Sequence, residues 1–71
     1  MQLLSKVHCG ATCTIKWMLG LPDIVTDYMH SLQVKQGSEI QVIQNSGNYL
    51  IINSSGKRIA LDSATAAKIH V

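Results

Sequence analysis

The stretch EIQVIQNSGNYLIIN, residues 39–53, decides the fold. Its two apolar-rich halves have the length and residue types of strands, and they flank Ser46-Gly47-Asn48. A glycine in a connection of about three residues can take the left-handed conformation that a tight hairpin turn needs. The stretch therefore predicts an antiparallel hairpin, and a turn at Gly47 would place Ile43 opposite Ile51.

Segments on both sides of this hairpin continue the period-two pattern of strands. Residues 57–61 follow a second turn signal, Ser54-Ser55-Gly56, and should extend the hairpin to a meander. Residues 11–16 alternate apolar and polar side chains and predict a first strand. Residues 68–71 alternate again. Because a strand that ends on a core residue has to be paired, we expect this last strand to pair with the first and to close a barrel.

One amphipathic helix is predicted at about residues 23–32, after the first strand. Its apolar side chains recur at helical spacing and form one stripe, which consists of Ile24, Val25, Tyr28, Met29 and Leu32. Asp62 or Ser63 can cap a short helical turn before the last strand. The fold class predicted is mainly β: a small barrel of about five strands, with one helix and one helical turn.

Length and composition limit the classes of function. With 71 residues the chain should form a single domain over residues 1–71, and its 46% hydrophobic content is typical of a folded protein. A net charge of +2 is small for a nucleic-acid-binding protein, so no nucleic acid is expected as partner. No run of about 18 apolar residues occurs. We expect a cytoplasmic protein without direct insertion into a membrane.

Three segments resemble one family. Gly37 opens a strand, Arg58-Ile59-Ala60-Leu61 forms an "xIAL" strand, and residues 66–71 form an "AxxIxV" ending. This pattern resembles the FeoA family of bacterial ferrous iron transport proteins over essentially the whole chain. The resemblance implies an SH3-like barrel that is an accessory to a ferrous iron permease. It further implies contact with the cytoplasmic GTP-binding part of that permease, and hence association with the inner face of the membrane through this partner.

The sequence departs from the family pattern at polar and turn positions. Tyr28 stands where the family helix commonly has Arg, and Gln33 and Gln36 stand at its usual Gly and Pro positions. Related barrels are C-terminal domains of iron-dependent repressors, so a metal-responsive regulatory domain is one alternative function. A nucleic-acid-binding barrel is another, with Lys57-Arg58 as its cationic pair.

Apolar side chains beyond the needs of one barrel interior point to binding of a partner. The Ile43/Ile51 pair lies on the face opposite the one that fills the barrel, so it is either covered by the helix or exposed for docking. Trp and Met in the loop after the first strand are frequent interface anchors and also common core residues. The candidate partner-binding residues are Trp17, Met18, Leu19, Tyr28, Ile43 and Ile51.

Two sets of side chains contain residue types that can ligate metal ions. His8 and Cys9, together with His70, could ligate ferrous iron or another transition metal ion. Cys13 lies roughly 13 Å from Cys9 along an extended strand, so we expect it to be a core residue instead. The second set shares one helical face, and we expect this face to be a solvated helix surface whose charges are placed favourably for the helix dipole. It consists of Asp23, Asp27 and His30.

No pattern of catalytic residues occurs in the chain. Serine and threonine are frequent, but no nucleophile elbow, P-loop or HExxH sequence accompanies them. We therefore expect no enzymatic activity and no required cofactor.

Overall fold

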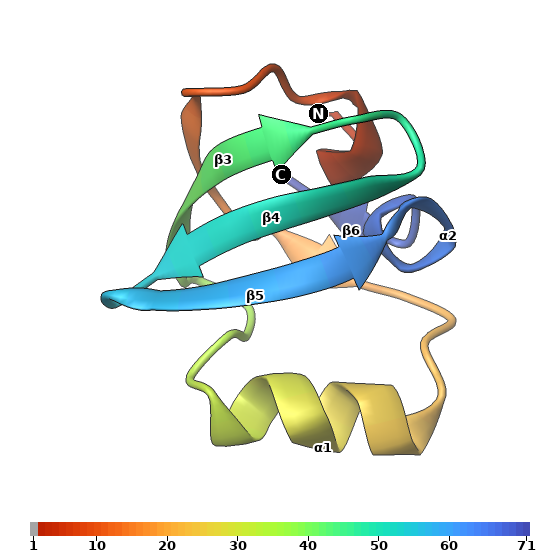
Figure 1. Cartoon of the computed structure of the whole chain (residues 1–71). Coiled ribbons are helices and arrows are strands. Elements are labelled where there is room, and N and C mark those ends of the chain that lie inside the picture. The colour runs from red at the N-terminus through yellow and green to blue at the C-terminus, as the bar shows by residue number, and fades with distance from the viewer. Residues whose placement is uncertain (1) are drawn as a thin grey trace.

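The computed structural model describes residues 2–71 (Figure 1). In chain order its elements are η1 (Leu4–Lys6), β1 (Thr12–Thr14), β2 (Trp17–Met18), α1 (Asp23–Ser31), β3 (Glu39–Asn45), β4 (Tyr49–Ser54), β5 (Lys57–Asp62), α2 (Ser63–Ala66) and β6 (Ile69–His70).

Two antiparallel sheets form the barrel. The larger has the strand order β1-β3-β4-β5, and the smaller consists of β2 and β6. The expected hairpin is β3–β4, and β5 extends it to the expected meander. Figure 1 shows β3, β4 and β5 as a curved layer, with β6 and α2 behind it. The mainly β fold class is confirmed, with six strands among residues 2–71 instead of about five.

The sixth strand arises because the predicted strand at residues 11–16 changes partner partway. Thr12 to Thr14 pair with β3 as β1, and the Ile15 N–H donates to the Ser38 carbonyl at 2.9 Å. One residue later the Lys16 N–H donates to the His70 carbonyl at 2.7 Å, and β2 continues along β6. The last strand therefore pairs just beyond the predicted first strand. This bend at Ile15 and Lys16 joins the two sheets at one corner.

A β-bulge in β3 changes the predicted register of the hairpin. Val42 lies opposite Ile52, but Gln44 lies opposite Ile51, so Ile43 is the extra residue. The predicted Ile43–Ile51 pair is therefore wrong. The bulge has a packing reason: it keeps Gln44 exposed, whereas strict alternation would turn this polar side chain toward the core.

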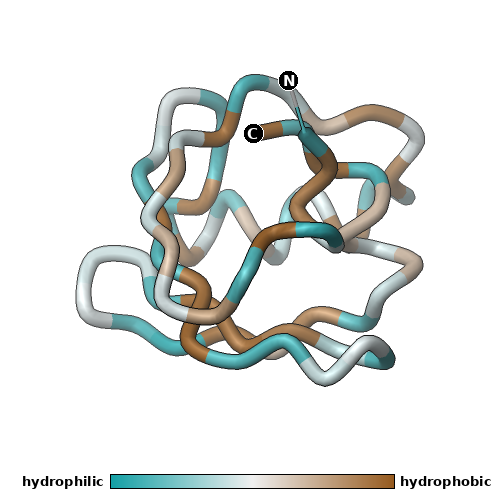
Figure 2. The backbone as a smooth tube through the Cα atoms, turned by 90° about the horizontal axis from the view of Figure 1, so that it is seen from above, coloured by the Kyte–Doolittle hydropathy of each residue, from teal (hydrophilic) through white to brown (hydrophobic). Residues whose placement is uncertain are grey.

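The core lies inside this barrel. Strict alternation along β4 and β5 buries every second side chain, and Figure 2 shows hydrophobic and hydrophilic residues following one another along the chain. The buried hydrophobic residues are Leu4, Val7, Ile15, Met29, Val34, Ile40, Val42, Leu50, Ile52, Ile59, Leu61, Ala66 and Ile69. Ile69 is fully buried as expected, and Val71 packs against the cluster while remaining half-buried.

The two ends of the described chain lie side by side. Gln2 and Val71 exchange two backbone hydrogen bonds, of 3.0 and 2.8 Å, and Leu3 forms a bridge with His70. Asn45 also ties the N-terminal segment to the barrel, because its amide donates to the carbonyls of Ser5 and Val7. The N-terminal segment thus becomes a neighbour of β6 and supports the closure of the barrel.

Helix α1 packs with a narrower stripe than predicted. Met29 is fully buried, and Val25 and Leu32 pack against the core. Ile24 and Tyr28 do not, because they point away from the barrel and remain exposed. Figure 1 shows α1 beyond the β5 side of the sheet, and none of the helices among residues 2–71 is long and apolar enough to cross a membrane.

Helix α2 is the helical turn predicted before the last strand. Asp62 is its N-cap, and its Oδ1 accepts a hydrogen bond of 2.7 Å from the Thr65 N–H. The turn buries Ala66 and leads directly into β6.

Candidate functional site

The six predicted partner-binding residues fall on three separate parts of the molecule. Ile43 and Ile51 belong to β3 and β4, Trp17 and Met18 to β2, and Tyr28 to α1. Leu19, which follows β2, is 61% exposed. We therefore consider the outer face of the larger sheet, the β2–β6 sheet and α1 in turn.

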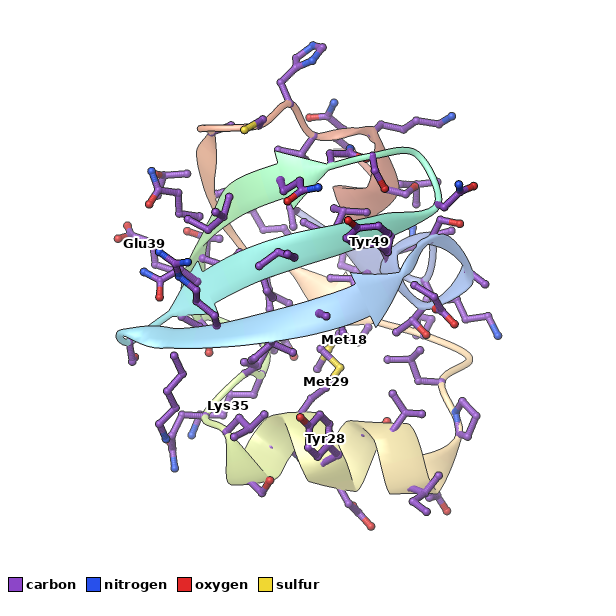
Figure 3. All side chains as sticks on the ribbon, in the orientation of Figure 1. Met18, Tyr28, Met29, Lys35, Glu39 and Tyr49 are labelled. Atoms are coloured by element: carbon purple, nitrogen blue, oxygen red, sulfur yellow. The ribbon has the colours of Figure 1, made fainter. Side chains whose placement is uncertain are left out.

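The outer face of β4 is the first part. Tyr49, Ile51 and Asn53 alternate with the buried side chains of this strand and point away from the core. Ile51 is half-buried and lies opposite the exposed Ala60 of β5. Figure 3 shows Tyr49 on this face, and its hydroxyl accepts a hydrogen bond from the Gln44 side chain at 3.0 Å. Since α1 lies elsewhere, the helix does not cover this face.

The bulge lies on the same face. Ile43 is half-buried, and its carbonyl oxygen accepts a hydrogen bond of 2.8 Å from the Cys9 thiol. The Gly10 N–H donates to the neighbouring Val42 carbonyl at 2.7 Å. The segment before β1 thus follows β3 past the bulge and satisfies carbonyl groups that the irregular ladder leaves free.

The β2–β6 sheet is the second part. Trp17 is partly exposed and lies opposite His70, with their ring centroids 5.2 Å apart. The His70 Nδ1 atom is buried and has no hydrogen-bond partner. Met18, the next residue, turns inward and packs against the core, which makes it less suited to docking than Trp17 or Leu19.

Helix α1 is the third part and contains the most exposed large apolar side chain. Ile24 is 79% exposed and Tyr28 is 57% exposed. They are four residues apart, so they lie next to each other on one face of the helix. Figure 3 shows Tyr28 outside the space between α1 and β5 that Met18 and Met29 fill. Sequence reasoning identified Tyr28 but assigned Ile24 to the buried stripe.

A polar cavity of about 320 Å³ opens near the β4–β5 turn. Three of its lining residues come from neighbouring strands. Thr12 of β1 lies opposite Gln41 of β3, and Gln41 lies opposite Asn53 of β4. Its lining consists of Thr12, Glu39, Ile40, Gln41, Asn53, Ser55 and Gly56. This set offers hydroxyl, amide and carboxylate groups but no histidine or cysteine.

The candidate metal ligands do not form a group of three or more among residues 2–71. No three His, Cys, Asp or Glu side chains of residues 2–71 form a group that could hold a metal ion. His8 is exposed, the Cys9 thiol bonds to the Ile43 carbonyl, and the His70 ring packs on Trp17. Cys13 is half-buried against the core, where desolvation raises the pKa of its thiol.

Comparison with known proteins identifies the architecture. A family model described as FeoA domain matches residues 2–71. A crystal structure of an iron uptake regulatory protein, FeoA, is 25% identical, with a TM-score of 0.79 over 94% of this chain and 88% of that one. A search of curated proteins found no match.

Two further solved structures share the fold. Zinc-bound FeoA from Stenotrophomonas maltophilia is described as a prokaryotic SH3 domain protein and a candidate ferrous iron transport activating factor. It is 18% identical, with a TM-score of 0.81 over 100% of this chain and 89% of that one. A manganese-dependent transcriptional repressor is 17% identical, with a TM-score of 0.83 over 96% of this chain and 39% of the repressor.

Proposed function

We propose, because this chain belongs to the FeoA family, that it is an accessory protein of a bacterial ferrous iron transport system. In this proposal it acts from the cytoplasmic side by binding the GTP-binding part of the iron permease. It has no catalytic role of its own and depends on protein–protein contact.

The exposed apolar side chains are the observation that supports a binding role. Trp17, Leu19, Ile24, Tyr28 and Tyr49 all keep more than a third of their surface in contact with water. A chain of this size has a small core, and burying these large side chains would have enlarged it. Aromatic side chains in particular are enriched among the residues that dominate protein–protein binding.

A binding assay with matched variants tests the proposal. The soluble GTP-binding domain of the permease from the same organism is immobilised, and retention of the purified chain is measured. The variants are Trp17→Ala for the β2 face, Tyr28→Ala for the α1 face and Ile51→Thr for the β4 face. Gln36→Ala, at an exposed polar position, is the control.

We expect retention of the wild type and the control, and a loss of about tenfold or more for at least one of the three faces, as for an interface anchor. Circular dichroism checks that each variant is folded. Failure of the wild type to bind the permease domain would reject the proposed partner. Retention of all three variants at the level of the wild type would reject the proposed residues.

A metal-responsive regulatory domain is the second candidate. The likeness to the manganese-dependent repressor favours it, although this chain spans only 39% of that protein. If this alternative holds, manganous ions at micromolar concentrations should broaden the amide signals near the site, and ferrous ions should shift or broaden them. Amide spectra that neither ion broadens or shifts would remove this candidate.

A further inference from the structure

The formal charges of the chain are unevenly distributed. Residues 17–34, which contain β2, α1 and their connections, hold two of the four carboxylates and none of the six Lys and Arg side chains. This segment therefore has a formal charge of −2, and the rest of the chain has +4. Figure 1 shows α1 on one side of the sheets, so its two carboxylates lie on that side, and the barrel cation Lys68 reaches this segment at the Gly20 carbonyl, 3.1 Å away.

Helix α1 combines this negative charge with exposed apolar side chains. Asp23 and Asp27 are both exposed and four residues apart, and each is followed directly in the sequence by the exposed apolar residue Ile24 or Tyr28. Ile24 comes three residues before Asp27 and four before Tyr28, and Asp23 comes four before Asp27, so these spacings place the four side chains next to one another along two turns. We call Asp23, Ile24, Asp27 and Tyr28 the α1 face.

We propose that the α1 face binds a segment of a partner protein in which apolar side chains are flanked by Lys or Arg. This inference rests on the proposed function and names the chemistry of the partner. Apolar side chains of the partner cover Ile24 and Tyr28, and its cations pair with Asp23 and Asp27. Such an arrangement is typical of amphipathic segments that dock through one face, and opposite charges at the rim favour the correct partner.

The net charge of the whole chain restricts where a basic segment can bind. A protein with a net charge of +2 repels a basic ligand at long range, so a basic segment gains attraction only where negative charge is concentrated locally. A second copy of this chain could offer Lys57 and Arg58 to the α1 face. Two copies that each carry a net charge of +2 repel one another at long range, so we assign the face to a different protein.

Nuclear magnetic resonance with a defined probe tests the inference independently of the permease. The isotope-labelled chain is titrated with a synthetic amphipathic peptide of Leu and Lys at helical spacing, and separately with the same peptide carrying Glu for Lys. Titrations at ionic strengths of about 10 and 150 mM separate charge from apolar contact. The expected result is that the Lys peptide, and not the Glu peptide, shifts amide signals of residues 23–31.

Charge and apolar variants identify the side chains responsible. Asp23→Asn combined with Asp27→Asn should weaken binding of the Lys peptide roughly three- to tenfold at low salt, since exposed ion pairs are individually weak. Ile24→Ala combined with Tyr28→Ala should weaken it at both salt concentrations. Glu39→Gln removes a negative charge from an exposed position on β3 and should leave binding unchanged.

Three results would overturn the inference. The first is a set of shifts confined to the β3–β4 face, or none. The second is equal binding by the wild type and the doubly neutralised variant. The third is self-association of the unliganded chain that the α1 variants abolish.

Parallel assays with the permease domain separate this inference from the proposed function. If that domain retains the neutralised and wild-type chains equally, the assignment of the α1 face fails while the function stands. If the Lys peptide binds as described but the permease domain does not bind the wild type, the proposed partner fails and the α1 face stands.

Discussion

Gln33 adopts a backbone conformation that normally favours glycine. Its φ angle is 65°, in the left-handed region. The Val34 N–H bonds to the Met29 carbonyl at 2.9 Å and the Gln33 N–H to the His30 carbonyl at 3.0 Å. These bonds define a Schellman motif that ends α1. The departure from the family's usual glycine at this position therefore leaves backbone strain in the chain.

Gln33→Gly should stabilise the protein. Relief of the left-handed strain outweighs the greater flexibility of glycine in the unfolded chain, so the free energy of unfolding should rise by about 0.5–1 kcal/mol. Urea unfolding measures the change. Gln36→Gly is the matched control, because Gln36 has no positive φ angle, and it should destabilise slightly. A lower stability for Gln33→Gly would contradict the assigned strain.

Asp62 should make stability depend on acid pH. The hydrogen bonds from Thr65 lower the pKa of its carboxyl below its ordinary value of 3.8. A lowered folded-state pKa means that the stabilisation is present above the unfolded pKa and is lost as pH falls through the folded one. Asp62→Asn keeps a capping oxygen but cannot titrate, so its stability should decrease less below about pH 4. Identical pH profiles of unfolding for the two proteins would contradict this.

At the scale of single elements, the hairpin was predictable and its bulge was not. The β3–β4 hairpin follows from two apolar segments around Gly47, and β5 from the alternation of Ile59 and Leu61. A bulge adds one residue without breaking an apolar run, so Ile43 looked like a paired residue. Its carbonyl accepts a hydrogen bond from the thiol of Cys9, which is distant in the sequence, and a sequence pattern does not reveal this contact.

That hydrogen bond should contribute measurably to stability. Cys9→Ala leaves the Ile43 carbonyl without its thiol donor, so the free energy of unfolding should fall by about 0.5–1 kcal/mol. Cys9→Ser retains a donor and should lie closer to the wild type. Thermal unfolding followed by circular dichroism compares the three proteins, and equal stability of all three would show that the bulge does not depend on Cys9.

The existence of α1 was predictable, but its orientation was only partly so. Five apolar residues at helical spacing predict a wide buried stripe, and the barrel accepts only the side chains of Val25, Met29 and Leu32. The end of a small barrel is narrow, so Ile24 and Tyr28 at the edge of the stripe remain outside. Each of the six docking candidates was recognised from the local sequence, whereas the distances between them depend on the tertiary fold.

For the whole molecule, closure of the barrel depends on its last strand. Ile69 is fully buried in β6. Ile69→Ala should lower the free energy of unfolding by about 2–5 kcal/mol, which is comparable to the roughly 3–5 kcal/mol that so small a core supplies. We therefore expect a largely unfolded protein, in which the amide proton chemical shifts span a narrow range. Ile24→Ala removes an isoleucine of the same size from an exposed position and should remain folded.

We propose that in the cell the whole molecule supports ferrous iron transport by binding a partner. The most direct measurement is the initial rate of ferrous iron uptake by cells that lack the chain, with the permease still present. We predict slower uptake that the wild-type chain restores and that a folded variant combining Trp17→Ala and Tyr28→Ala does not. Uptake at the normal rate in cells without the chain would contradict the account.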